Sequence, residues 1–387
     1  MRLAVCACVF ASALIASALI ASAPGFARDA APDGAKTDIG TLQGVSYRID
    51  IPAGWNRGLV VFYHGYSVDP IEFEQGERLS PMFDGMLERG FAVIQSAYSA
   101  AGWAVEEGYA DTERLRAHFV DAYGKPNETF VAGMSMGGTL TVLTIESRPD
   151  VYDGALSLCG AIEPTDRLMQ RDFALRAAFD FYFPNLMGPL VPVPADFKPQ
   201  GALVRRIAAA MEADPRSTAA LHAIYGAGRT DDLPPVLVDI TYDIKEMQQR
   251  THGNPFGNAD MIYTGTADDF ALNDGVRRYQ AETAPLQAMA RWYTPTGKLT
   301  RPMLALHDSG DPLVPASSAF EYAIMAQRAG HGANFVQQYV NAHGHCVFEQ
   351  AQVTVAFDEL VAWKRNGKRP QSGMLPSSAK VSLPRRE

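Results

Sequence analysis

The stretch VAGMSMGGTL (residues 131–140) places Ser135 between two methionines, with a glycine two positions away on either side. The apolar run ETFVAG (128–133) predicts a buried strand before it, and MGGTLTVLTIESRP (136–149) predicts a helix after it. A tight turn from strand to helix needs glycines, because side chains there would collide, and it raises the serine above the sheet edge. The stretch therefore predicts a nucleophilic Ser135, with an ordinary turn serine as the alternative.

Strand and helix patterns alternate on both sides of this turn. Strands are expected at 45–52, 58–66, 91–99, 128–133 and 154–162, and helices at 82–90, 111–124 and 136–149. After a long interruption, further strands are expected within 301–315 and 334–348, and further helices at 317–330 and 357–367. This order predicts an α/β fold, with a mostly parallel sheet and helices on both faces.

The interruption divides the chain into a sheet-containing core (40–162 and 300–367) and a mostly helical insertion (163–299), which we call the cap. The insertion is too long to be a loop, and the tail (368–387) is expected to be disordered. Trp103 of the core could line a substrate site or belong to the interior. The same alternatives, a substrate site or packing of the cap against the core, apply to the cap aromatics Phe179, Phe181, Tyr182, Phe183, Trp292 and Tyr293.

The N-terminus combines Arg2, a run rich in Ala, Leu and Ile, and then small residues. This pattern predicts a signal peptide over residues 1–27, removed after Ala27; an uncleaved anchor is the alternative. We therefore expect an exported protein, periplasmic or secreted, without a membrane span after removal of the leader. Only Cys159 and Cys346 would remain, and they can form a disulfide or stay as two buried thiols.

Charge and motifs exclude several functions. The net charge is −9 and is spread along the chain, whereas nucleic-acid binding calls for a basic patch. There is no H-E-x-x-H, no cysteine pair at zinc spacing and no glycine-rich phosphate loop. We therefore expect no metal and no organic cofactor. The sequence does not predict an oligomeric state.

A nucleophilic serine needs a histidine base and a carboxylate that orients the base, in the chain order Ser, acid, His for this kind of turn. LHDSGDPLVP (306–315) offers Asp308 and Asp311 just past a buried strand. We favour Asp311 because it fits the G-D-P turn, and Asp308 is then a turn cap. NAHGHCVF (341–348) offers His343 and His345. We favour His345, which follows a glycine and precedes the last helix.

The negatively charged oxygen of an acyl-transfer intermediate needs backbone N–H donors. One is expected from Met136, the residue after the nucleophile. The other is expected from Tyr66, where the strand expected at 58–66 passes into its loop. His64 and Gly65 let this loop pass close to the substrate carbonyl, although His64 can equally be a packed turn residue.

Four segments together resemble the α/β-hydrolase superfamily over about residues 45–363: HGY (64–66), GMSMG (133–137), SGDPLVP (309–315) and GHCVF (344–348). The His345–Cys346 pair is also similar to that of secreted tannase and feruloyl-esterase relatives, in which the cysteine after the histidine is bonded to one beside the serine. Here Met134 precedes Ser135, so that motif is incomplete. Cys159, at the end of the next strand, could still reach Cys346.

The resemblance implies an exported serine hydrolase that cleaves a small-molecule or oligomeric carboxylic ester through an acyl-enzyme. A serine aminopeptidase of the same fold is the first alternative. It would need acidic residues for an ammonium group, and the sequence offers Glu106, Glu107, Asp268 and Asp269. The second alternative is a non-catalytic, hydrolase-like binding protein, although the intact Ser, Asp and His argue against it.

Overall fold

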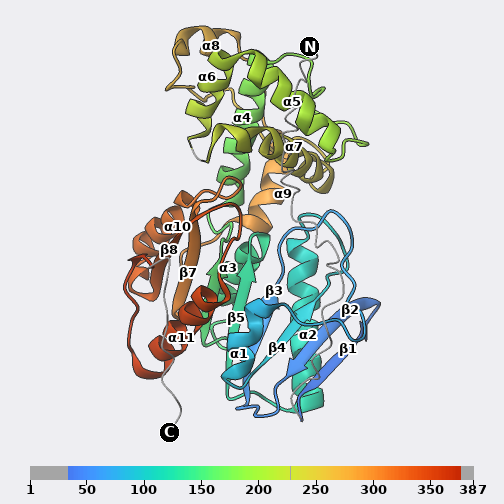
Figure 1. The fold of residues 1–387 in the computed structure, drawn as a ribbon, viewed down its shortest axis with the longest axis vertical. Coiled ribbons are helices and arrows are strands. Elements are labelled where there is room, and N and C mark those ends of the chain that lie inside the picture. Colours follow the sequence, from blue (N-terminus) through green and yellow to red (C-terminus); the bar gives the residue numbers. More distant parts are fainter. Residues whose placement is uncertain (1–33, 227, 376–387) are drawn as a thin grey trace, which may run out of the picture. The chain divides into compact units, whose positions relative to one another are not determined.

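The computed structural model describes residues 34–226 and 228–375. These residues form a nine-stranded sheet in the order β1-β2-β4-β3-β5-β6-β7-β8-β9 (Figure 1). The pairs β1/β2 and β2/β4 are antiparallel, and the other neighbouring pairs are parallel. The strands are β1 (Lys36–Leu42), β2 (Val45–Ile51), β3 (Gly58–Tyr63), β4 (Phe91–Ser96), β5 (Glu128–Met134), β6 (Gly154–Leu158), β7 (Met303–Gly310), β8 (Phe335–His343) and β9 (Gly373–Met374).

The central strands are mostly apolar because helices cover both faces of the sheet. Every residue of β3 and β4 is buried, and the parallel register places Val61 beside both Ile94 and Val131. Since β3, β5, β6, β7 and β8 are parallel, their carboxyl ends lie at one edge of the sheet. The loops that follow these strands can therefore meet there.

Two hydrophobic clusters pack on opposite faces of the sheet. Residues of α2 (Val105–Tyr123), α3 (Met136–Ser147) and α10 (Ser317–Arg328) belong to the first cluster. Residues of α1 (Asp84–Glu88) and α11 (Gln350–Asn366) belong to the second cluster. The short 3-10 turns η1 (Pro81–Phe83) and η3 (Gly332–Asn334) complete the core.

All described elements between β6 and β7 are helical (Figure 1, green to orange). They are α4 (Thr165–Tyr182), α5 (Gly201–Ala213), α6 (Pro215–Tyr225), η2 (Thr230–Asp232), α7 (Leu233–Arg250), α8 (Asp269–Gly275) and α9 (Thr283–Tyr293). Their buried side chains continue the hydrophobic cluster that contains α2 and α3, so cap and core share one interior. Ser135 lies between β5 and α3, and the cap lies between β6 and β7. This arrangement is the predicted α/β-hydrolase fold, which is thereby confirmed.

Both ends of the sheet extend past the predicted boundaries. β1 starts before residue 40 because Gln43 and Gly44, with φ of 53° and 85°, form a two-residue turn that returns the chain as an antiparallel hairpin. The tail is not disordered at its start: β9 pairs with β8, and the Leu375 N–H donates to the Tyr339 carbonyl at 2.7 Å. This pairing satisfies backbone groups that an edge strand would leave open.

Residues 376–387 and the predicted signal peptide (1–27) lie outside the described residues. Among the helices that the structure does describe, none has both the length and the apolar character needed to cross a membrane.

Candidate active site

Ser135 occupies a strained turn between β5 and α3. Its φ and ψ are 55° and −123°, a conformation that is uncommon for a residue with a side chain. The flanking glycines allow this turn, because a Cβ at Gly133 would collide with the Gly137 carbonyl oxygen, and a Cβ at Gly137 would collide with the Tyr63 carbonyl oxygen. The G-x-S-x-G spacing therefore has a steric cause here.

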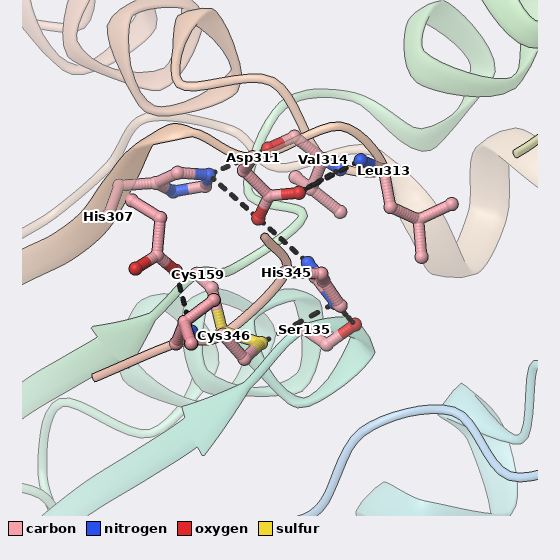
Figure 2. Close-up of a disulfide and its surroundings, with 10 residues drawn as sticks. Ser135, Cys159, His307, Asp311, Leu313, Val314, His345 and Cys346 are labelled. Carbon is pink, nitrogen blue, oxygen red and sulfur yellow. Dashed lines mark hydrogen bonds and ion pairs between the residues drawn. A yellow bond between two sulfur atoms is a disulfide. The ribbon is translucent and has the colours of Figure 1, made fainter. Parts of the chain in front are cut away.

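His345 connects Ser135 to Asp311. Its Nε2 lies 2.7 Å from Ser135 Oγ, and its Nδ1 lies 2.7 Å from Asp311 Oδ2 (Figure 2). The second carboxylate oxygen of Asp311 accepts the N–H groups of Leu313 at 2.9 Å and Val314 at 3.0 Å. These bonds fix the carboxylate, whose side chain is fully buried, whereas the His345 side chain is 22% exposed. A base in contact with both a hydroxyl and a fixed carboxylate can take a proton from the hydroxyl.

The two competing residues have other partners. Asp308 accepts the Val347 N–H at 3.1 Å, and burial raises its pKa to about 6. His343 contacts Asp232 of the cap, with Nε2 3.1 Å from Oδ1. In the structure, therefore, Asp311 and His345 are brought to Ser135, while Asp308 and His343 hold the neighbouring loops.

His307, which the sequence did not single out, lies behind Asp311. Its Nε2 donates to the Val314 carbonyl at 2.7 Å, and burial lowers its pKa (Figure 2). The neutral ring therefore supports the turn that holds Asp311 and adds no positive charge beside the carboxylate.

The two predicted N–H donors lie next to Ser135. Met136 is the first residue of α3, so its N–H has no partner within the helix. Gly65, the residue before Tyr66, lies so close to the serine that a Cβ there would be 3.1 Å from Ser135 Cβ. Among the described residues, neither the Tyr66 N–H nor the Met136 N–H donates to another group. Both are available to a ligand oxygen.

His64 stabilises this loop. Its ring stacks on Tyr98 with centroids 3.7 Å apart, and the Tyr98 hydroxyl donates to the His64 carbonyl at 3.1 Å. Burial lowers the pKa of His64 to about 4. The ring is therefore neutral at pH 7, and its Nδ1 lies 2.6 Å from the Gly65 carbonyl oxygen, to which it can donate. This is the packed-turn role given above as the alternative for His64.

Cys159 and Cys346 form a disulfide, with Cα atoms 5.2 Å apart (Figure 2). It joins the end of β6 to the residue after His345, and so attaches the histidine loop to the sheet. The sulfur atoms and a His345 ring nitrogen lie within 4.8 Å of one another. This trio does not offer a thiolate site for a metal, because the two sulfurs are bonded to each other.

The helix α7 carries an acidic face that was not predicted from the sequence. Asp239, Asp243 and Glu246 follow one another at intervals of four and three residues, which places them on one side of the helix. Glu246 accepts the Trp103 N–H at 3.2 Å. Burial raises the pKa of Asp239 to about 6, and the charge of nearby His345 opposes this shift. The spacing was visible in the sequence, but it is equally typical of a solvent-facing helix side.

The four acidic residues named from the sequence are used differently. Glu107 forms an ion pair with Arg250 at 3.1 Å, and Asp268 caps α8 through the Ala271 N–H at 2.9 Å. Asp269 accepts the N–H groups of Gly265 and Thr266. Glu106 has no hydrogen bond or ion pair to another described residue.

Of the aromatic residues, Phe179 and Phe183 are buried and stack at 5.3 Å within the cap. Phe181 and Tyr182 contact each other at the partly buried edge of the same cluster. Trp103 is 5% exposed and packs at 6.2 Å from Tyr66, so it lies behind the loop that carries a predicted N–H donor. The side chains of Trp292 and Tyr293 are outside the described residues.

Comparison with known proteins gives partial matches. Residues 43–176 match the model of a tannase-like family of unknown function. An o-phthalyl amidase from Xanthobacter agilis is 23% identical over 411 residues, covering 87% of this chain and 88% of that protein.

Among solved structures, an esterase/lipase from an uncultured bacterium has a TM-score of 0.41 and 12% identity, covering 87% of each chain. A puromycin-hydrolysing peptidase from Mycobacterium tuberculosis has a TM-score of 0.45 and 14% identity, covering 88% of this chain and 41% of that one. The strand order and the turn at Ser135 are those of the α/β-hydrolase fold, and residues 43–176 of this fold are similar to the tannase-like family.

Proposed function

We propose that the protein is an exported serine hydrolase that cleaves carboxylic esters through an acyl-enzyme. The observation that carries this proposal is the continuous hydrogen-bonded chain from Asp311 through His345 to Ser135. A serine hydroxyl is a weak nucleophile by itself, and a base at 2.7 Å that is oriented by a buried carboxylate is the arrangement that activates it.

In the first half-reaction, Ser135 Oγ attacks the ester carbonyl carbon while its proton moves to His345 Nε2. The carbonyl oxygen becomes negative and accepts the N–H groups of Tyr66 and Met136, and the α3 N-terminus adds favourable electrostatics. When the intermediate collapses, the bond to the alcohol oxygen breaks and His345 returns the proton to that oxygen. Asp311 keeps the imidazolium oriented throughout and stabilises its charge.

In the second half-reaction, water replaces the alcohol. His345 accepts a proton from the water as its oxygen attacks the acyl carbon. The bond to Ser135 Oγ then breaks, and the proton passes to the serine. The products are a carboxylic acid and the free enzyme, and no cofactor enters the balance.

One observation supports export, and another bears on the substrate. The Cys159–Cys346 disulfide is typical of an oxidising compartment, which agrees with export; the N-terminal residue of the secreted protein tests cleavage after Ala27. The relative at 23% identity is called an amidase, so an amide substrate is the alternative to an ester.

Labelling of the protein with a fluorophosphonate probe tests the activated serine. We expect wild type to be labelled and Ser135→Ala not to be labelled, with both proteins folded by circular dichroism. Absence of labelling in folded wild type would favour the non-catalytic binding protein. A panel of p-nitrophenyl esters and aminoacyl anilides then separates an esterase from an aminopeptidase, and we expect faster hydrolysis of the esters.

A further inference from the structure

The cap is hydrogen-bonded to the loop that carries His345. His343 Nε2 lies 3.1 Å from Asp232 Oδ1 of η2, and the imidazole donates because a carboxylate can only accept. His343 is the last residue of β8 and lies two positions before His345. The Asp232 side chain is 16% exposed, so water competes little for this bond. A group of the cap thus reaches the chain segment that leads into the candidate base.

Asp232 is held in place within the cap. Its other carboxylate oxygen, Oδ2, accepts the Arg229 N–H, and the Asp232 N–H donates to the Arg229 carbonyl at 3.1 Å. Leu233, the next residue and the first of α7, is fully buried. The carboxylate therefore has one oxygen bound within the cap, and its other oxygen faces His343.

The same cap segment packs against the turn that carries Asp311. A Cβ at Gly228 would lie 2.7 Å from Asp232 Oδ2 and 3.2 Å from the Cβ of Pro312, the residue after Asp311. The Gly228 backbone therefore lies against both Asp232 and Pro312. Residues 228–232 of the cap thus contact the loop of the candidate acid as well as the loop of the candidate base.

The two sides of His345 are anchored differently. On its C-terminal side, the disulfide attaches the next residue to the sheet. On its N-terminal side, Gly344 has a φ of 128°, a conformation that favours glycine and leaves no side chain to pack. The Gly344 N–H donates to the Gly310 carbonyl at the longer distance of 3.3 Å. The bond from His343 to the cap adds an anchor on this weaker side.

We propose that Asp232 and His343 are positioning residues through which the cap holds His345 at Ser135. Neither residue is assigned a contact with the substrate or the reacting atoms, so their effect passes through His345. This role rests on the proposed hydrolase function, because the action of His345 as a base belongs to that function. It makes the docked cap a condition for an activated serine, since the base loses an anchor when η2 leaves the core.

The kinetics of fluorophosphonate labelling test this role. The limiting rate of inactivation, kinact, and the half-saturating probe concentration, KI, are measured for wild type, Asp232→Ala, His343→Ala and the double variant. Displacement of a catalytic group by about 1 Å can cost about 100-fold in rate, and the disulfide limits the displacement here. We therefore expect kinact to fall by about tenfold in each single variant, with KI unchanged. The double variant should lose no more than either single variant, because both substitutions remove the same hydrogen bond.

Asp231→Ala is the matched control. Asp231 belongs to the same 3-10 turn and carries the same charge, but it is exposed and its side chain has no hydrogen bond to another described residue. We expect this variant to keep the kinact of wild type. Asp232→Asn retains an oxygen acceptor and should recover part of the loss seen in Asp232→Ala. A residue that served only to stabilise the fold would change the midpoint of urea unfolding and leave the kinact of the folded protein unaltered.

Amide hydrogen exchange measures the attachment of the loop without any chemistry at the serine. The Gly344 N–H is bonded to the Gly310 carbonyl, so exchange in a peptide that covers residues 341–349 reports the state of the loop. In the Ser135→Ala background, Asp232→Ala should raise exchange in this peptide by about fivefold, the opening expected from the loss of one hydrogen bond. Exchange in β3 should not change, and Asp231→Ala should alter neither segment.

Equal kinact in wild type and Asp232→Ala would overturn the inference, as would losses that add in the double variant. If folded wild type is not labelled at all, the hydrolase is refuted and exchange alone decides. Faster exchange in Asp232→Ala would then keep the attachment of the histidine loop to the cap, and unchanged exchange would overturn that attachment too.

Discussion

Reduction of the Cys159–Cys346 disulfide should lower both stability and activity. The two cysteines are separated by 187 positions, so the bond closes a very long loop in the unfolded chain. In the chain-entropy treatment, the entropy lost by the unfolded state is about 2.1 + 1.5R ln n cal/mol/K, which for this loop corresponds to about 5 kcal/mol at 25 °C. We expect the free energy of unfolding to fall by about that amount.

The assay is urea unfolding of the protein without residues 1–27, followed by circular dichroism, with and without a reducing agent. This protein contains no other cysteine, so disulfide exchange within a chain does not complicate it. Reduced wild type keeps both sulfur atoms and therefore isolates the effect of the bond. A Cys159→Ala and Cys346→Ala double variant should lose slightly more, because Cys159 is fully buried and its truncation leaves a cavity.

Activity supplies the second measurement. Because Cys346 is adjacent to His345, reduction should also lower the rate of fluorophosphonate labelling under conditions in which the protein stays folded. A loss of less than about 1 kcal/mol on reduction would refute the entropy reasoning. An unchanged labelling rate would show that the histidine loop is held by its other contacts, such as the hydrogen bond from the Val347 N–H to Asp308.

Two further predictions concern single residues. Gly137→Ala should lower the free energy of unfolding by at least about 2 kcal/mol, because its Cβ would meet the Tyr63 carbonyl oxygen. Urea unfolding measures the change, and Gly54→Ala is the control, because a Cβ at Gly54 meets nothing within 4 Å. Equal stability of the two variants would contradict the steric argument. Burial raises the pKa of Asp239 from 3.8 to about 6. Between these two pH values the folded state holds a proton that the unfolded state has released. The free energy of unfolding of wild type should therefore fall as the pH rises from about 4 to about 6. Asp239→Asn should therefore be more stable than wild type by up to about 3 kcal/mol above pH 6 and equal to it at pH 3; parallel pH profiles of the two proteins would exclude the shift.

The Asp239 prediction connects stability with the candidate active site, because Asp239 lies close enough to His345 for their charges to interact. A residue whose replacement stabilises the fold but lowers activity is typical of a functional position. A structural residue would show the opposite change in stability. Stability and the rate of fluorophosphonate labelling, both measured on Asp239→Asn, therefore distinguish these roles.

Much of the core could be predicted because its signals are local. The run that became β3 is apolar throughout, and the runs that became β4 and β5 are mostly apolar, which is sufficient to predict buried parallel strands. Ser135, Asp311 and His345 each follow a strand, and parallel strands bring their carboxyl ends to one edge. The order of the chain was therefore sufficient to bring these three residues together.

The cap could not be predicted at the same level, because its side chains acquire their surroundings through long-range packing. Asp239 and Asp243 belong to a helix whose acidic side looks solvent-facing in the sequence, whereas Asp268 and Asp269 were equally plausible ligands but serve a helix cap and a turn. The strand β9 has only two residues, too few for any periodicity. The distance between Cys159 and Cys346 likewise depends on the complete fold.

The disulfide has a consequence for proteolysis. The bond between Cys159 and Cys346 encloses the whole cap within a covalent ring. A protease that cuts the chain once within this ring, for example in the long connection between α7 and α8, produces two fragments that remain attached. Ser135 and His345 would then lie on different polypeptides, which the disulfide at Cys346, the residue after His345, still joins. A chain of this design can be nicked and still keep Ser135 and His345 on one molecule.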